Sequence, residues 1–123
     1  MKTLILVLCV LFILIVVSEC YYDSEEYLYP RFCDTTNITF AQSVKPILQD
    51  HCYFCHSNST FSNGGGIRLE DYADVKTKAD DGSLLGSITH TTGFSAMPMG
   101  TGKLEDCKIT FIQTWIGAGS PDN

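Results

Sequence analysis

The clearest helical pattern of hydrophobic positions lies in residues 43–51. It predicts a helix with Ser43 as its N-cap and Pro46 in its first turn, where a missing N–H costs no hydrogen bond. The helix should run directly into Cys52, because the periodic positions continue up to that residue. Its apolar face is formed by Val44, Ile47, Leu48 and His51.

A second apolar face of helical spacing predicts the last helix, over residues 105–118. Glu105 and Asp106 at its start suit the partial positive charge of a helix N-terminus. Gly119 and Pro121 are typical of a helix stop. The apolar positions of this helix are Ile109, Ile112, Trp115 and Ile116.

Between these helices, residues 69–79 and 83–90 have mixed periodicity and predict two shorter helices separated by Gly82. The stretches 57–66 and 91–102 have the small and polar composition of loops. No segment alternates like a strand over more than about four residues, and no internal repeat is found. The predicted fold class is therefore all-α.

Residues 1–19 are predicted to be a signal peptide of the lipoprotein type. One basic residue, Lys2, is followed by an unbroken apolar run over residues 4–17, which is the build of an export signal. The run is shorter than the about 20 apolar residues that span a bilayer. Its end resembles a lipobox with Cys20 as the lipid anchor, although Glu19 stands where a small residue is expected. An uncleaved signal anchor is the alternative.

Residues 20–32 combine acidic residues, four tyrosines and Pro30 without a helical or strand period, and are predicted to be a tether. Twelve extended residues would let a domain sit up to roughly 40 Å from the membrane. Residues 33–123 then form one small domain. A domain of this size has a limited hydrophobic core, and covalent cross-links would compensate for it.

The chain carries a net charge of −6 at pH 7, and nothing in it resembles a basic patch. Removal of residues 1–19 takes away Lys2 and Glu19 and leaves the net charge unchanged. Nucleic acid is therefore not an expected partner. The acidic balance would instead favour a protein partner with a basic docking face.

The residues that carry chemistry centre on Cys52-Tyr53-Phe54-Cys55-His56, the attachment sequence for haem c. Two thiols three positions apart on a helical turn can add across the two haem vinyl groups. The adjacent histidine can then bind the iron from the same face. The export signal agrees with this interpretation, because haem c is attached outside the cytoplasm.

Two other interpretations of the Cys52–Cys55 pair find less support. A thioredoxin-like redox pair would require a surrounding βαβ pattern, which the sequence lacks. A zinc site would require two more ligands, and the candidates do not have the paired spacing that zinc modules show. Those candidates are His51, His90, Cys33 and Cys107.

A sixth iron ligand is expected from the loop over residues 91–102, which contains two methionines. Met97 is favoured, because Pro98 holds the preceding residue extended, which suits a side chain directed out of a loop toward a metal. Met99 is the first alternative. His90 is the second, and a bis-histidine iron would have a markedly lower potential.

Together these segments resemble class I cytochromes c, and more narrowly small bacterial exported cytochrome c domains. The resemblance covers about residues 39–121 and implies one haem wrapped by three to four short helices. It also implies His56 and Met97 as axial ligands, and first and last helices that cross at their apolar faces. The matching segments are Cys52-x-x-Cys55-His56, Gly65-Gly66-Ile67-Arg68-Leu69-Glu70, Met97-Pro98 and Ile112-x-x-Trp115-Ile116-x-Ala118-Gly119.

Cys33 and Cys107 are extra to the general pattern of that family. If Cys20 carries lipid and the two motif cysteines carry haem, they remain as an even pair in an oxidising compartment. Crossing terminal helices would bring them together, so a disulfide is expected, with two separate thiols as the alternative. Arg68 is a candidate partner for a haem propionate, since a guanidinium binds a carboxylate through two parallel bonds. A solvated charge is the alternative for Arg68.

These features predict an extracytoplasmic electron carrier with one covalent haem c rather than an enzyme. The alternative is a haem-based redox enzyme subunit or a gas-binding sensor, either of which needs a displaceable sixth ligand. The expected partners are redox proteins and, through the N-terminal lipid, the membrane. The chain is expected to be a monomer on the periplasmic or cell-surface side.

Overall fold

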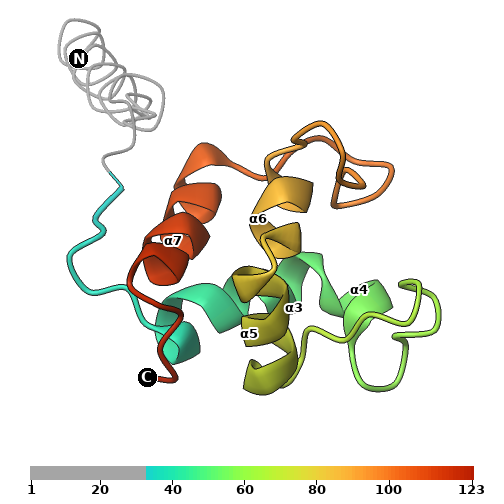
Figure 1. Ribbon diagram of the computed structural model, residues 1–123, viewed down its shortest axis with the longest axis horizontal. Coiled ribbons are helices and arrows are strands. Elements are labelled where there is room, and N and C mark those ends of the chain that lie inside the picture. Colours follow the sequence, from blue (N-terminus) through green and yellow to red (C-terminus); the bar gives the residue numbers. More distant parts are fainter. Residues whose placement is uncertain (1–32) are drawn as a thin grey trace, which may run out of the picture. The chain divides into compact units, whose positions relative to one another are not determined.

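The computed structural model describes residues 33–123, and the predictions for the signal peptide, Cys20 and the tether lie outside the described residues. This part contains helices and no strand, which confirms the predicted all-α class. No helix within it is long and apolar enough to cross a bilayer. In chain order the elements are η1 Phe40–Val44, α3 Lys45–His51, α4 Tyr53–His56, α5 Tyr72–Asp80, α6 Ser83–Ile88 and α7 Asp106–Gly117 (Figure 1).

The first helix begins earlier than the sequence predicts, and Ser43 is not its N-cap. The Thr39 hydroxyl caps it by accepting a hydrogen bond from the Gln42 N–H at 3.1 Å. The Ser43 hydroxyl accepts one in return from the Thr39 N–H at 3.2 Å. The first turn, η1, is π-helical and continues into α3. Pro46 lacks an N–H and its ring crowds the carbonyl four residues earlier, which accounts for the widened turn.

The centre of the core lies where η1 packs against α7. The Phe40 ring centroid is 5.4 Å from that of Trp115 and 5.2 Å from that of Tyr72. The first and last helices therefore meet through apolar side chains. The core side chains with no exposed surface are Val44 and Leu48 on the first helix, Ile112 and Trp115 on α7, and Val75 on α5.

Covalent and polar links close the two ends of this arrangement. Cys33 is joined to Cys107, in the first turn of α7, by a disulfide with Cα atoms 5.5 Å apart, a separation usual for such bonds. Asn123 accepts hydrogen bonds from the N–H groups of Phe40, at 2.8 Å, and Ala41, at 2.9 Å. These N–H groups open a helix and would otherwise have no partner within it.

The helix boundaries differ from the predictions where a tertiary contact intervenes. α5 begins after Leu69, because the Leu69 N–H is bonded to the His56 carbonyl at 2.8 Å and that segment must stay beside α4. α6 ends before His90, whose φ of 58° no right-handed helix can contain. α7 agrees with the prediction to within one residue at each end.

Candidate functional site

The five motif residues lie at the junction of α3 and α4. Cys52 separates the two helices with φ −122° and ψ −34°. Its carbonyl accepts hydrogen bonds from the N–H of Cys55 at 3.1 Å and of His56 at 2.9 Å. One helical turn therefore carries both thiols and the imidazole. Neither Cys52 nor Cys55 is in a disulfide.

The His56 imidazole is buried, only 8% exposed, and oriented by a main-chain carbonyl. Its Nδ1 lies 3.0 Å from the Ile67 carbonyl oxygen. A carbonyl can only accept, so Nδ1 carries the proton and donates it. This tautomer leaves the Nε2 lone pair for a metal. A carbonyl partner on the far nitrogen is what fixes the ring and raises the basicity of metal-binding histidines.

The chain after the motif folds back closely over His56. A Cβ atom at Gly64 would lie within 2.7 Å of the Cys55 carbonyl oxygen and closer still to the His56 ring. Only glycine permits this approach of the backbone to the imidazole. The hydrogen bond between the Leu69 N–H and the His56 carbonyl holds the end of this loop in place. Residues 64–69 thus form a cradle for His56.

Burial raises the pKa of the Cys52 thiol to about 11. At neutral pH this cysteine is therefore a thiol with very little thiolate. Redox-active Cys-x-x-Cys pairs depend on the opposite shift, a lowered thiol pKa. The electrostatics of Cys52 thus speak against thiol–disulfide exchange, as does the lack of any strand among residues 33–123. The same part of the chain contains no cluster of three or more His, Cys, Asp or Glu side chains that could hold a metal ion.

Arg68 is exposed, and its guanidinium carbon lies 4.1 Å above the centroid of the Phe61 ring. The loop that contains Phe61 is further tied by Asn58, whose N–H donates to a Glu70 carboxylate oxygen at 2.7 Å. The Asn58 side-chain amide donates to Asp71 at 3.0 Å. Arg68 therefore has a partner inside this loop. Its role toward a haem propionate stays a prediction.

Met97 is half-buried, and its main-chain polar groups are bonded to Ser87, in the last turn of α6, and to His90, just after that helix. Its N–H donates to the Ser87 carbonyl at 3.1 Å, and its carbonyl accepts from His90 Nε2 at 3.0 Å. Met99 is 78% exposed. Met97, rather than Met99, is therefore the methionine that the loop holds in place. His90 is the other candidate ligand, and its Nε2 is already hydrogen-bonded to the Met97 carbonyl.

We call residues 52–70 the His56 side of the site and residues 89–101 the Met97 side. The two sides are held by separate sets of hydrogen bonds. Figure 1 shows α4 and the loop after α6 on the side of the domain away from α7. Among the residues described, no hydrogen bond links segment 89–101 with segment 52–70. The residues present are two thiols, one oriented imidazole and a methionine whose main chain is held, and these are the residue types that hold covalent haem with His/Met ligation.

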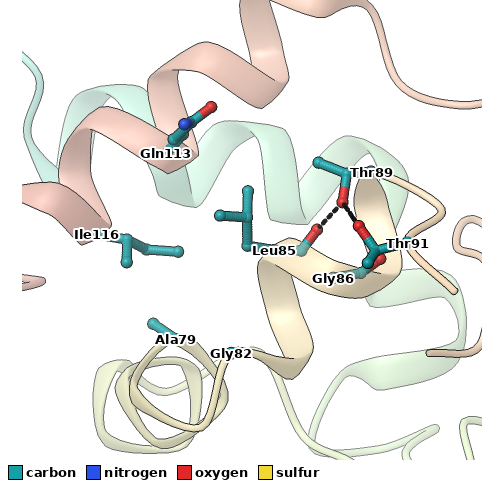
Figure 2. Close-up of a pocket in the computed structure, with 8 residues that line it drawn as sticks. All are labelled: Ala79, Gly82, Leu85, Gly86, Thr89, Thr91, Gln113 and Ile116. Atoms are coloured by element: carbon teal, nitrogen blue, oxygen red, sulfur yellow. Dashed lines mark hydrogen bonds between the residues drawn. The ribbon is translucent and has the colours of Figure 1, made fainter. Parts of the chain in front are cut away.

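A separate hollow of about 390 Å³ lies between α5, α6 and α7 (Figure 2). The Thr89 hydroxyl donates to the Leu85 carbonyl at 2.7 Å and is 2.8 Å from the Thr91 hydroxyl. None of the predicted site residues lines the hollow. Its lining consists of Ala79, Gly82, Leu85, Gly86, Thr89, Thr91, Gln113 and Ile116.

Comparisons of the chain with protein-family models, with curated proteins and with solved structures found no match in any of the three. The residues and their geometry are therefore the basis for assigning a function.

Proposed function

We propose that this chain is an exported c-type cytochrome with the class I fold, which carries single electrons on one covalently attached haem. The observation that supports this most strongly is the environment of the His56 ring, meaning its position, its burial and its hydrogen bond. Its place directly after Cys55, its burial and its Nδ1–H bond to the Ile67 carbonyl prepare Nε2 as an iron ligand.

In this proposal Cys52 and Cys55 would hold the haem through thioether bonds, and His56 and Met97 would bind its iron. When bound, the haem supplies an iron that gains or loses one electron. The protein's part is to keep both ligands in place in either oxidation state. For His56 this is done by the Ile67 carbonyl and the close backbone at Gly64. For Met97 it is done by hydrogen bonds to Ser87 and His90.

The test is an absorption spectrum of the full chain, produced in a host with a haem c attachment system. We expect haem that survives acid–acetone extraction and a sharp α band in the reduced protein that CO leaves unchanged. Complete extraction of the haem would contradict the proposed attachment. A Soret band shifted by CO would instead support the gas-sensor or redox-enzyme alternative, because CO binds only where the sixth position opens.

Lipid anchoring at Cys20 and docking to a partner with a basic face belong to the same proposal. The net charge of −6 supports the second of these. Cys20→Ser should move the protein from the membrane fraction to the soluble fraction if Cys20 carries the lipid. A variant that stays in the membrane fraction would favour the uncleaved signal anchor.

A further inference from the structure

The loop that carries Met97 is closed by hydrogen bonds that converge on Ser87, in the last turn of α6. The Ser87 carbonyl oxygen accepts from the N–H of His90 at 3.2 Å and from the N–H of Met97 at 3.1 Å. The His90 imidazole then extends back to the Met97 carbonyl, at 3.0 Å from Nε2. We call this closed arrangement of Ser87, His90 and Met97 the loop clasp.

The backbone of His90 has an unusual conformation. Its φ of 58° lies in the left-handed region, where among residues 33–123 the only other non-glycine residue is Ser120. A side chain in this region costs free energy, and such residues persist where surrounding contacts determine them. The left-handed turn reverses the chain after α6 and brings the His90 ring to a carbonyl seven residues later. The hydrogen bond from the His90 ring to the Met97 carbonyl is a contact that this backbone conformation makes possible.

The chemistry of the acceptor determines the state of the His90 ring. The Met97 carbonyl can only accept, so His90 donates from a protonated Nε2. A donating Nε2 has no lone pair for iron. In this arrangement His90 acts on the backbone of the methionine ligand and is not itself a ligand through that nitrogen.

The rest of the loop is held elsewhere on α6. The Thr91 N–H donates to the Gly86 carbonyl at 2.9 Å, and the Phe94 N–H donates to the Thr91 carbonyl at 3.2 Å. The Phe94 ring packs directly over Gly86, where a Cβ atom would lie within 2.6 Å of ring atoms. These contacts fix the first half of the loop. Within the described residues, the hydrogen bonds that hold Met97 itself come from Ser87 and His90.

We propose that His90 is a positioning residue for the sixth iron ligand, which holds the Met97 carbonyl and thereby sets the direction in which the Met97 side chain leaves the loop. This proposal about His90 rests on the proposed function and therefore concerns the haem-loaded protein. With both main-chain groups of Met97 hydrogen-bonded, one to Ser87 and the other to His90, the side chain is the part of the residue that remains to reach the iron. The loop clasp also opposes displacement of Met97 by an external ligand, which is what separates a closed electron carrier from an open haem site.

The test compares three variants of the full haem-loaded chain. His90→Gly suits the left-handed backbone and removes the side-chain bond, so its effect is not due to strain. His90→Gln restores an N–H donor of similar length. Thr92→Ala is the control, since Thr92 is an exposed residue of the same loop whose side chain makes no hydrogen bond among the described residues. The readouts are hydrogen exchange of the Met97 amide, the methionine–iron charge-transfer band and the affinity for added imidazole.

We expect His90→Gly to raise both the exchange rate of the Met97 amide and the affinity for imidazole by roughly five- to tenfold, the effect of losing one hydrogen bond. The charge-transfer band should weaken in parallel. His90→Gln should recover a substantial part of each loss, and Thr92→Ala should match the wild type. Wild-type behaviour of His90→Gly would overturn the proposal, and so would equal losses in the glycine and glutamine variants.

A failure of the proposed function has a different signature. If the wild type itself lacks the charge-transfer band, then Met97 is not the iron ligand and the assignment of His90 to ligand positioning is overturned with it. If the band is present in the wild type, the three variants decide the role of His90 alone.

Discussion

His56 and Met97 both depend on a hydrogen bond to a main-chain carbonyl, but the two sides of the site are built differently. His56 lies in a helix, is 8% exposed, and is covered by a backbone segment that leaves room only for glycine at position 64. Met97 lies in a loop, is half-buried, and is held by a loop clasp at the end of a six-residue helix. A buried helical turn resists rearrangement, whereas a loop can open by breaking a few hydrogen bonds. Changes near His56 should therefore affect attachment and stability, and changes near Met97 should affect ligation while the fold persists.

The largest difference between the two sides is expected from removing the groups that we propose to contact the haem. Cys52→Ser or Cys55→Ser should leave haem removable or absent, because at most one thioether remains. Met97→Ala should keep the haem attached but lose the weak charge-transfer band of the ferric spectrum, and Met99→Ala should keep that band. Acid–acetone extraction and absorption spectra measure both effects. Haem retained with an unchanged haemochrome spectrum in both cysteine variants would contradict the attachment, and a wild-type ferric spectrum that lacks the band would promote His90.

The disulfide between Cys33 and Cys107 lies outside both the His56 side and the Met97 side, so its removal is a reference for variants of either side. Its loss should lower the stability of the whole domain without changing the proposed iron ligands. Replacing both residues by serine should cost about 4 kcal/mol in the chain-entropy model, and less where covalent haem already restricts the unfolded chain. Denaturant unfolding measures the cost, with the charge-transfer band as the control. Thiol counting on the processed, denatured, haem-loaded protein should find no free thiol, whereas two would show that the bridge is absent.

Two glycine substitutions compare the rigidity of the two sides directly. Gly64→Ala should cost about 3 kcal/mol, at the upper end for overpacking, because the added Cβ meets the His56 ring and the Cys55 carbonyl, and neither can move away. Gly86→Ala should change stability by less than about 1 kcal/mol. There the new Cβ meets the Phe94 ring, which is 42% exposed and has room to shift outward, and the gain of about 1 kcal/mol in helix propensity offsets the cost of that shift. Equal costs in denaturant unfolding would show that the loop is as rigid as the His56 cradle.

The thiol of Cys52 offers a pH-dependent measure of burial on the His56 side before attachment. Its pKa is raised from 9.0 to about 11 by burial, so folding favours the neutral thiol. This contribution to stability is present below pH 9 and is lost as the pH rises from 9 to about 11. In the haem-free protein at neutral pH, iodoacetamide should modify Cys52 about a hundredfold more slowly than in the denatured chain. Equal rates, measured by mass spectrometry of the Cys52 peptide, would show that the thiol is not buried.

The smallest effect is expected at Arg68, on the exposed edge of the His56 side. Arg68→Gln should cost less than about 1 kcal/mol, and Phe61→Leu should cost a similar amount, because both remove the same cation–π contact. The predicted contact with a haem propionate would add a shift of the midpoint potential that only Arg68→Gln shows. Redox titration of both variants separates the two roles. An unshifted potential in Arg68→Gln would favour the solvated charge.

Several features of this site follow from short-range spacing and could be predicted from the sequence. The separation of Cys52, Cys55 and His56 on one turn is a property of the helix itself, and α7 is bounded by residues that begin and end helices in isolation. The prediction of Ser43 as the N-cap of the first helix was wrong, because Thr39 and Ser43 both have hydroxyls suited to capping. Only the packing of Phe40 against Trp115, together with the Asn123 hydrogen bonds, makes the helix start at the earlier residue.

The groups that orient the two proposed ligands were decided by the tertiary structure alone. The glycine run at 64–66 indicates a close backbone approach, yet nothing in the sequence says that Gly64 approaches His56 or that the Ile67 carbonyl meets its Nδ1. The same holds for the Ser87 carbonyl. Every residue has such a carbonyl whatever its side chain, so its partner depends on how distant segments pack. The sequence by itself therefore determined which side chains are candidates to hold a haem, while the path of the main chain decided which of these candidates are oriented by hydrogen bonds.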